Sequence, residues 1–254
     1  MIIIKTDSEI ARLRKGGPIL AHILREVAKK VAPGITTGEL DQYAYQLIKE
    51  AGHTPAFLNY KPEGADFPYP ASLITSVNAE VVHGIPGKKI LKEGDIIALD
   101  LGLNFDGVFL DHAITIAVGG ITTPKDKLLI AVTEQALYKG IEAIVPGATV
   151  GDIGHAIESF VKPYKLGIVR SLSGHGVGRA IHEDPYIPNY GKPGKGAKLE
   201  PGMVIAIEPM LTRGSEEIVT MRDGYTLKTV DNSRSAHFEH TVLITETGAE
   251  ILTK

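Results

Sequence analysis

Apolar residues in the first thirty positions recur at intervals of three and four, which is the spacing of one face of an α-helix. The face is formed by Ile10, Leu13, Leu20, Ile23, Leu24, Val27 and Val31. A kink is expected at Gly16-Gly17-Pro18, because proline inside a helix removes a main-chain hydrogen bond. A later helix is predicted from Thr123-Pro124, since proline favours the first turn of a helix. Its expected inner side carries Leu128, Val132, Ala136 and Ile144.

Two short apolar runs, DIIALDLGL (95–103) and GMVIAIEPM (202–210), predict buried β-strands. Each run contains a carboxylate, Asp100 or Glu208, and a buried carboxylate is costly unless it is paired, protonated or bound to metal. Asp106-Gly107 is typical of a two-residue hairpin turn, which would place Asp100 and Asp111 diagonally on one face. A four-residue loop would pair them directly. Either arrangement sets two negative charges side by side and requires a cation.

The chain contains an internal duplication. APGITTGEL (32–40) recurs 113 positions later as VPGATVGDI (145–153), and each copy predicts a Pro-Gly turn followed by a helix with a capping box. Thr36 and Glu39 form the first box, Thr149 and Asp152 the second. Three more pairs follow in the same order: VVHGIP (81–86) with AIHEDP (180–185), LKEGDIIALD (91–100) with LEPGMVIAIE (199–208), and FLDHAITI (109–116) with HFEHTVLI (237–244). We therefore predict one domain, 1–254, of two half-repeats (about 8–120 and 121–254) around a pseudo-two-fold axis.

The duplication also pairs the residues that carry chemistry. Counterparts are His83 and His182, Asp100 and Glu208, and Asp111 and Glu239. The four carboxylates match the charge of two divalent cations, and oxygen ligands with one imidazole suit Mn, Fe, Co or Zn. Two such ions can hold a bridging hydroxide and stabilise a tetrahedral intermediate. The alternative is pairing with lysine or arginine, but the four strands carry no basic residue near these acids.

Composition excludes several other classes of function. The 254 residues are 43% hydrophobic and 22% charged, as in ordinary globular proteins. A formal net charge of -3 gives no electrostatic basis for binding nucleic acid or membrane. The run MIII is too short for a signal peptide or a membrane span. Without cysteine there are no disulfides or thiolate zinc sites, which fits the cytoplasm.

The blocks SVNAEVVHGIP, GHGVGRAIHEDP, GMVIAIEPM and SAHFEHTVLIT resemble the signature blocks of type I methionine aminopeptidases, in order and spacing, across essentially the whole chain. The resemblance implies the pita-bread fold, a duplicated α/β (α+β) domain with a mainly antiparallel sheet flanked by helices. It also implies removal of the initiator methionine from nascent polypeptides whose second residue is small, with a metal-bridged hydroxide attacking the scissile carbonyl. We further expect a cytoplasmic monomer that acts on peptide and nascent-chain N-termini, including those at the ribosome.

The resemblance also implies roles for particular residues. The ligands of two divalent ions (Co, Mn, Fe, Zn or Ni) would be Asp100, Asp111, His175, Glu208 and Glu239. Asp100 would chelate one ion, Asp111 and Glu239 would bridge both, and His175 and Glu208 would complete the other site. Catalysis would use Glu208 as the proton carrier, with His83 and His182 facing the substrate. The methionine pocket would include Tyr69, Ile181 and Tyr225.

Some positions depart from the family pattern. His237 stands where the family often has Gln, and His112 stands where a small polar residue is common. Either histidine could alter metal affinity by contacting the ligand residues rather than the ion. The segment 57–73 is longer than usual and borders the methionine pocket in the family. The other histidines, His22, His53, His155 and His240, are interpreted as surface or packing residues.

Two other functions fit parts of the pattern. Prolidase and aminopeptidase P have a closely similar site, but they usually carry an additional N-terminal domain, whereas the first repeat here begins near the start of the sequence. Metal-free binding modules of the same fold have lost ligands, whereas this chain keeps all five. Both observations favour the aminopeptidase.

Overall fold

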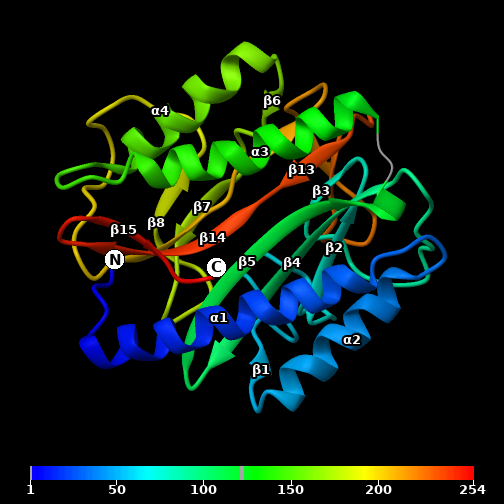
Figure 1. Ribbon diagram of the computed structural model, residues 1–254, viewed down its shortest axis with the longest axis horizontal. Coiled ribbons are helices and arrows are strands. Elements are labelled where there is room, and N and C mark those ends of the chain that lie inside the picture. The colour runs from blue at the N-terminus through cyan, green and yellow to red at the C-terminus, as the bar shows by residue number, and fades with distance from the viewer. Residues whose placement is uncertain (1, 121–122) are drawn as a thin grey trace.

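The computed structural model, drawn in Figure 1, describes residues 2–120 and 123–254. Met1 and the boundary expected between the half-repeats at residue 121 lie outside the described residues. The α-helices are α1 (Asp7–Lys30), α2 (Thr37–Glu50), α3 (Pro124–Glu142) and α4 (Val150–Val161), with short 3₁₀ turns η1 (Val118–Gly120) and η2 (Lys162–Tyr164). The β-strands are β1 (Thr54–Pro55), β2 (Leu73–Val77), β3 (Glu80–Val82), β4 (Ile96–Phe105), β5 (Val108–Ala117), β6 (Gly167–Ile168), β7 (Ser173–Gly176), β8 (Glu183–Pro188), β9 (Val204–Ile207), β10 (Met210–Thr212), β11 (Ile218–Thr220), β12 (Leu227–Thr229), β13 (Ser235–His237), β14 (Glu239–Thr245) and β15 (Gly248–Ile251). In the part of the chain that is described, none of the helices has the length and apolar character needed to cross a membrane.

Helix α1 follows the predicted apolar spacing and continues through Pro18 as one helix. It begins at a capping box in which the Glu9 carboxylate accepts a hydrogen bond from the Thr6 main-chain nitrogen at 2.7 Å. At Gly17, a Cβ atom would lie 2.1 Å from the carbonyl oxygen of Leu252. Glycine at this position therefore lets the helix pack closely against the C-terminal segment.

Both capping boxes predicted from the duplication are confirmed. At the start of α2, the Glu39 carboxylate accepts a hydrogen bond from the Thr36 main-chain nitrogen at 2.8 Å. At the start of α4, Asp152 accepts one from Thr149 at the same distance, 2.8 Å. The repeated segments thus begin equivalent helices with the same local hydrogen bonds.

Helix α3 begins after Thr123 as predicted, but it ends at Glu142, so Ile144 lies beyond it, and the assignment of Leu128 to its inner side is wrong. Val132 and Ala136 are buried, whereas Leu128 is 43% exposed and Leu129 is fully buried. Adjacent residues of a helix are about 100° apart around its axis, so only one of the two leucines can face the core. Position 129 is in phase with 132 and 136.

The strands form one large antiparallel sheet in the order β1-β4-β5-β14-β9-β7-β8, with β2 paired to β4 and β15 to β14. Two small sheets have the orders β13-β10-β6 and β11-β12-β3. In Figure 1 the large sheet is strongly twisted; α1 and α2 lie beside β4 and β5, and α3 and α4 lie toward β7 and β8. Apolar residues gather in one cluster beneath α1 and α2 and in another beneath α3 and α4. The predicted α/β fold, a mainly antiparallel sheet flanked by helices, is confirmed.

Strands β5 and β14 meet at the centre of this sheet, where two threonine side chains extend a short main-chain ladder. The Thr241 hydroxyl donates to the carbonyl oxygen of Asp111 at 2.7 Å and accepts from its N–H at 2.9 Å. The Thr115 hydroxyl makes the same two contacts with the main chain of His237, at 2.7 and 2.9 Å. The Thr241 hydroxyl therefore joins β14 to β5, and the Thr115 hydroxyl joins β5 to the end of β13.

Candidate metal centre

Asp100 and Asp111 lie on the β4–β5 hairpin, which has the predicted register. Gly102 pairs with Asp111, and Asp100 pairs with Ala113. The turn is formed by Asp106-Gly107, with φ of 49° and 83° at the two residues. The prediction that both carboxylates share one face is confirmed, since paired and alternate residues of a strand point the same way. Their exposed fractions are 6% and 3%, so the hairpin buries two like charges side by side.

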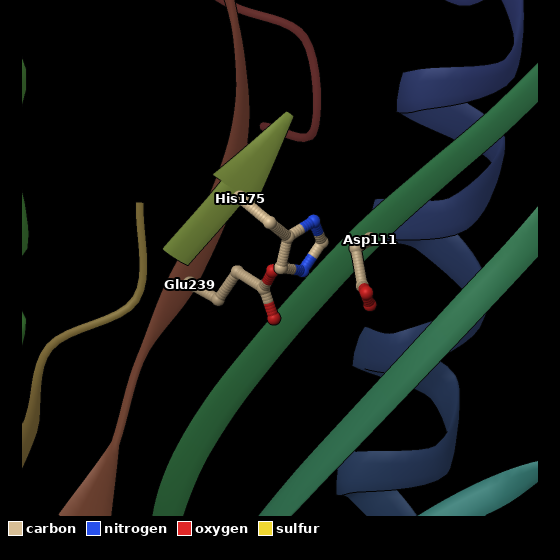
Figure 2. Close-up of side chains that lie close together, drawn as sticks. All are labelled: Asp111, His175 and Glu239. Atoms are coloured by element: carbon tan, nitrogen blue, oxygen red, sulfur yellow. The ribbon is translucent and has the colours of Figure 1, made fainter. Parts of the chain in front are cut away.

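Strands β14 and β7 bring two more predicted ligands to the same face. Glu239 pairs with Ala113, the residue that also faces Asp100, so these three lie in one row across the sheet. Figure 2 shows the side chains of Asp111, His175 and Glu239 converging from three strands. One ligating atom from each of these three lies within 4.8 Å of the others.

Glu208, directly after β9, completes the group. Its side chain is 12% exposed, and its Oε1 atom lies 3.4 Å from Nε2 of His175. Its other oxygen, Oε2, lies 3.4 Å from Nε2 of His237. The structure thus gathers all the predicted ligands around one space and adds a second buried histidine to them.

Two glycines explain how His175 reaches this position. A Cβ atom on Gly174 would lie 2.3 Å from the carbonyl oxygen of Ala206, and one on Gly176 would lie 2.2 Å from that of Asp184. Both neighbouring strands therefore approach the backbone of β7 more closely than any side chain would allow.

The four carboxylates lack a basic partner: among the ion pairs of the described residues, none joins them to lysine or arginine. Burial raises the pKa of Asp111 and of Glu208 to about 8. Burial and the neighbouring carboxylates raise the pKa of Asp100 and of Glu239 well above the ordinary range. Asp100 Oδ1 and Glu239 Oε1 are buried without a hydrogen-bond partner in the described chain. Divalent cations would satisfy these oxygens and neutralise the charge, so the donor set fits a metal site.

His175 is oriented as a metal ligand needs to be. Its Nδ1 atom lies 2.9 Å from the carbonyl oxygen of Gly176, which can only accept a hydrogen bond. Nδ1 therefore carries the proton, and the lone pair of Nε2 is directed toward Glu208. Burial lowers the pKa of His175 to about 3, so the ring is neutral at ordinary pH.

The two histidines predicted to face the substrate lie on the same cavity. His182 packs its ring edge-on against His175, with ring centroids 4.4 Å apart, and its Nδ1 atom lies 2.9 Å from the hydroxyl of Tyr60. His83 adopts a φ of 59°, a left-handed conformation that is uncommon for a residue with a side chain. Tyr60 was missed in the sequence, although it lies in the segment that was noted as longer than usual.

The carboxylates and histidines line a cavity of about 270 Å³, and aromatic residues form another part of its lining. The hydroxyl of Tyr69 donates to the carbonyl oxygen of Gly84 at 2.9 Å, and that of Tyr225 donates to the carbonyl oxygen of Phe67. These bonds satisfy the two hydroxyls and leave the rings to form an apolar wall. Among the described residues, Ile181 is not part of the cavity lining; it is 2% exposed and packs in the core cluster beneath α1 and α2.

Comparison with known proteins agrees with this geometry. The family model described as "Metallopeptidase family M24" matches residues 11–246. Methionine aminopeptidase 1 of Bacillus subtilis is 47% identical over 254 residues, with 100% of both chains covered. The crystal structure of methionine aminopeptidase from Thermotoga maritima superposes with a TM-score of 0.95 at 47% identity, covering 100% of both chains. Prolidase from Pyrococcus furiosus gives a TM-score of 0.76 at 27% identity, covering 99% of this chain and 65% of its own.

Proposed function

Because the chain belongs to metallopeptidase family M24, and relatives that match it over their full length are methionine aminopeptidases, we propose that it removes N-terminal methionine from peptides and nascent polypeptides. The observation that carries this proposal is the convergence of four carboxylates on one small cavity, three of them buried and Glu208 12% exposed, without a basic partner and beside a histidine. A metal-free binding module would have no use for such a costly cluster.

The ligand set follows from the roles inferred above. Asp100 would hold one divalent ion, Asp111 and Glu239 would bridge two ions, and His175 and Glu208 would complete the second site. The bound ions would lower the pKa of water and polarise the scissile carbonyl group. Oxygen ligands with imidazole admit Co, Mn, Fe, Zn or Ni.

The side chains of this protein would then carry the protons and orient the peptide. Glu208 would take a proton from the attacking water at its carboxylate and return it to the leaving amine. Because the Tyr60 hydroxyl can donate to Nδ1 of His182, the Nε2–H group of that ring is free to donate to the carbonyl oxygen of the substrate. His83 lines the same cavity and would supply a second contact with the peptide.

The aromatic wall supports a preference for methionine. Tyr69 and Tyr225 meet edge to face with ring centroids 5.2 Å apart, and both line the cavity. A thioether packs favourably against aromatic rings. Ile181 lies in the core cluster next to the cavity. We therefore expect it to support the residues that line the cavity by packing, without contacting the substrate.

We also propose that the catalytic domain consists of the two predicted half-repeats. The β5–β14 register supports this, because His112 pairs with its counterpart His240, with stacked rings 4.7 Å apart. Two isolated bridges are counterparts as well: Thr36 with Ile90, and Thr149 with Lys198. A cytoplasmic location, a monomeric state and action at the ribosome remain predictions.

Peptide hydrolysis tests the proposed function. We expect the protein, supplied with Co(II) or Mn(II), to release methionine from Met-Ala-Ser but to leave Ala-Pro intact. The matched control is N-acetylated Met-Ala-Ser, which lacks the free amine and should not be cleaved. Cleavage of Ala-Pro in preference to Met-Ala-Ser would instead identify a proline-specific peptidase.

A further inference from the structure

His237 is the last residue of β13 and lies beside the proposed metal centre. Two hydrogen bonds with the Thr115 hydroxyl fix its main chain, and it lies two positions before Glu239. The residue is 1% exposed, and its ring lines the same cavity as the carboxylates.

Both ring nitrogens of His237 are buried and without a hydrogen-bond partner among the described residues. Its Nε2 atom lies 3.4 Å from Oε2 of Glu208 and 3.9 Å from Oε2 of Glu239. Buried polar atoms in proteins are almost always satisfied, so this unpaired imidazole directed at two carboxylates indicates an absent partner.

The separations fit a shared metal ion. Two donors each about 2.1 Å from one ion lie about 3.4 Å apart at a tetrahedral angle and about 3.0 Å apart at a right angle. Nε2 of His175 is also 3.4 Å from Glu208, but from the opposite oxygen, Oε1. The Glu208 carboxylate is thus flanked by two imidazoles, one at each oxygen.

We infer that His237 is a second imidazole ligand, binding through Nε2 the ion that Glu208 and Glu239 hold. This rests on the proposed metallopeptidase function and adds a sixth ligand residue to the five already proposed. A second nitrogen makes the set more favourable to borderline ions such as Zn(II) and Co(II) than to Mn(II). The chain should therefore discriminate among these ions more strongly than a centre with one histidine.

Anomalous diffraction from Co(II)-loaded crystals of the unaltered protein tests the inference without a variant. We expect an ion about 2.0–2.2 Å from Nε2 of His237. Ions bound only to the other five residues, with His237 more than about 3 Å from each, would overturn the inference and leave the proposed function intact. Crystals without any bound ion would contradict the proposed metal centre itself.

The His237→Gln variant gives a second measurement in solution. We expect Zn(II) and Co(II) to bind at least about tenfold more weakly by calorimetry, Mn(II) to be affected less, and the visible spectrum of bound Co(II) to change. The control is His155→Gln on α4, which should change neither the metal affinities nor the visible spectrum of bound Co(II). If His237 served only as a hydrogen-bond donor to Glu208, the glutamine amide would replace it, and unchanged affinity and spectrum would refute ligation.

Discussion

Replacing Lys5 by methionine should destabilise the protein by about 3 kcal/mol. Nζ of Lys5 lies 2.5 Å from Oε2 of Glu183, and the two side chains are only 1% and 3% exposed. Breaking a buried ion pair by removing one partner typically costs about 3–5 kcal/mol, because the other charge stays buried. Glu183 keeps main-chain hydrogen bonds from Arg179 and Ala180 at Oε1, which places the cost at the lower end of that range.

Thermal unfolding measures this cost. For a chain of this size, about 2–4 °C is lost per kcal/mol, so the melting temperature should fall by about 6–12 °C. The control is Arg14→Met, which breaks an ion pair with Glu250 whose side chains are 51% and 35% exposed. That loss should be at most about 1 kcal/mol. If both variants lost the same small amount, the reasoning from burial would be wrong.

The remaining predictions concern the site. His175→Ala should weaken metal binding measured by calorimetry, with partial rescue of activity by excess metal, whereas His182→Ala should keep its metal and lose about 10²–10³ in kcat; the reverse pattern would exchange their roles. Tyr60→Phe should lower kcat with little change in KM for Met-Ala-Ser, because His182 loses the hydroxyl that fixes its proton; an unchanged kcat would remove Tyr60 from the mechanism. After chelation, the free energy of unfolding should fall as pH rises from about 5 to about 9, because Asp111 and Glu208 have pKa values near 8 when folded and ordinary lower values when unfolded. Denaturant unfolding across this pH range would measure the slope, which added divalent cations should reduce; a flat profile in the chelated protein would contradict the raised pKa values.

Features that depend on local spacing could be predicted from the sequence. The Asp106-Gly107 turn sets the register of β4 and β5, and with it the shared face of Asp100 and Asp111. The capping boxes follow from side chains three residues apart, which can contact each other wherever the helix lies. The ligand types followed from the cost of burying carboxylates among apolar residues.

Features that depend on packing between distant segments could not be predicted from the sequence. The Tyr60–His182 contact joins residues 122 positions apart, and the Lys5–Glu183 pair joins residues 178 positions apart, so no spacing in the sequence indicates either. Leu128 was misplaced because two adjacent leucines offer alternative helix phases, and the sheet beneath α3 selects between them. The sequence marks His237 as a departure from the family pattern. The orientation of its ring toward Glu208, however, depends on how β13 packs beside the end of β9.

Metal titration of the chelated protein tests the central claim most directly, with metal binding and release of methionine from Met-Ala-Ser followed in the same samples. We expect activity to be lost on chelation and to return in proportion to bound Co(II) or Mn(II). The Glu208→Gln variant is the control for proton transfer, with kcat lower by about 10²–10⁴ even at saturating metal. Activity that survives exhaustive chelation, in protein shown to contain no metal, would contradict the assignment of the buried carboxylates as a catalytic metal centre.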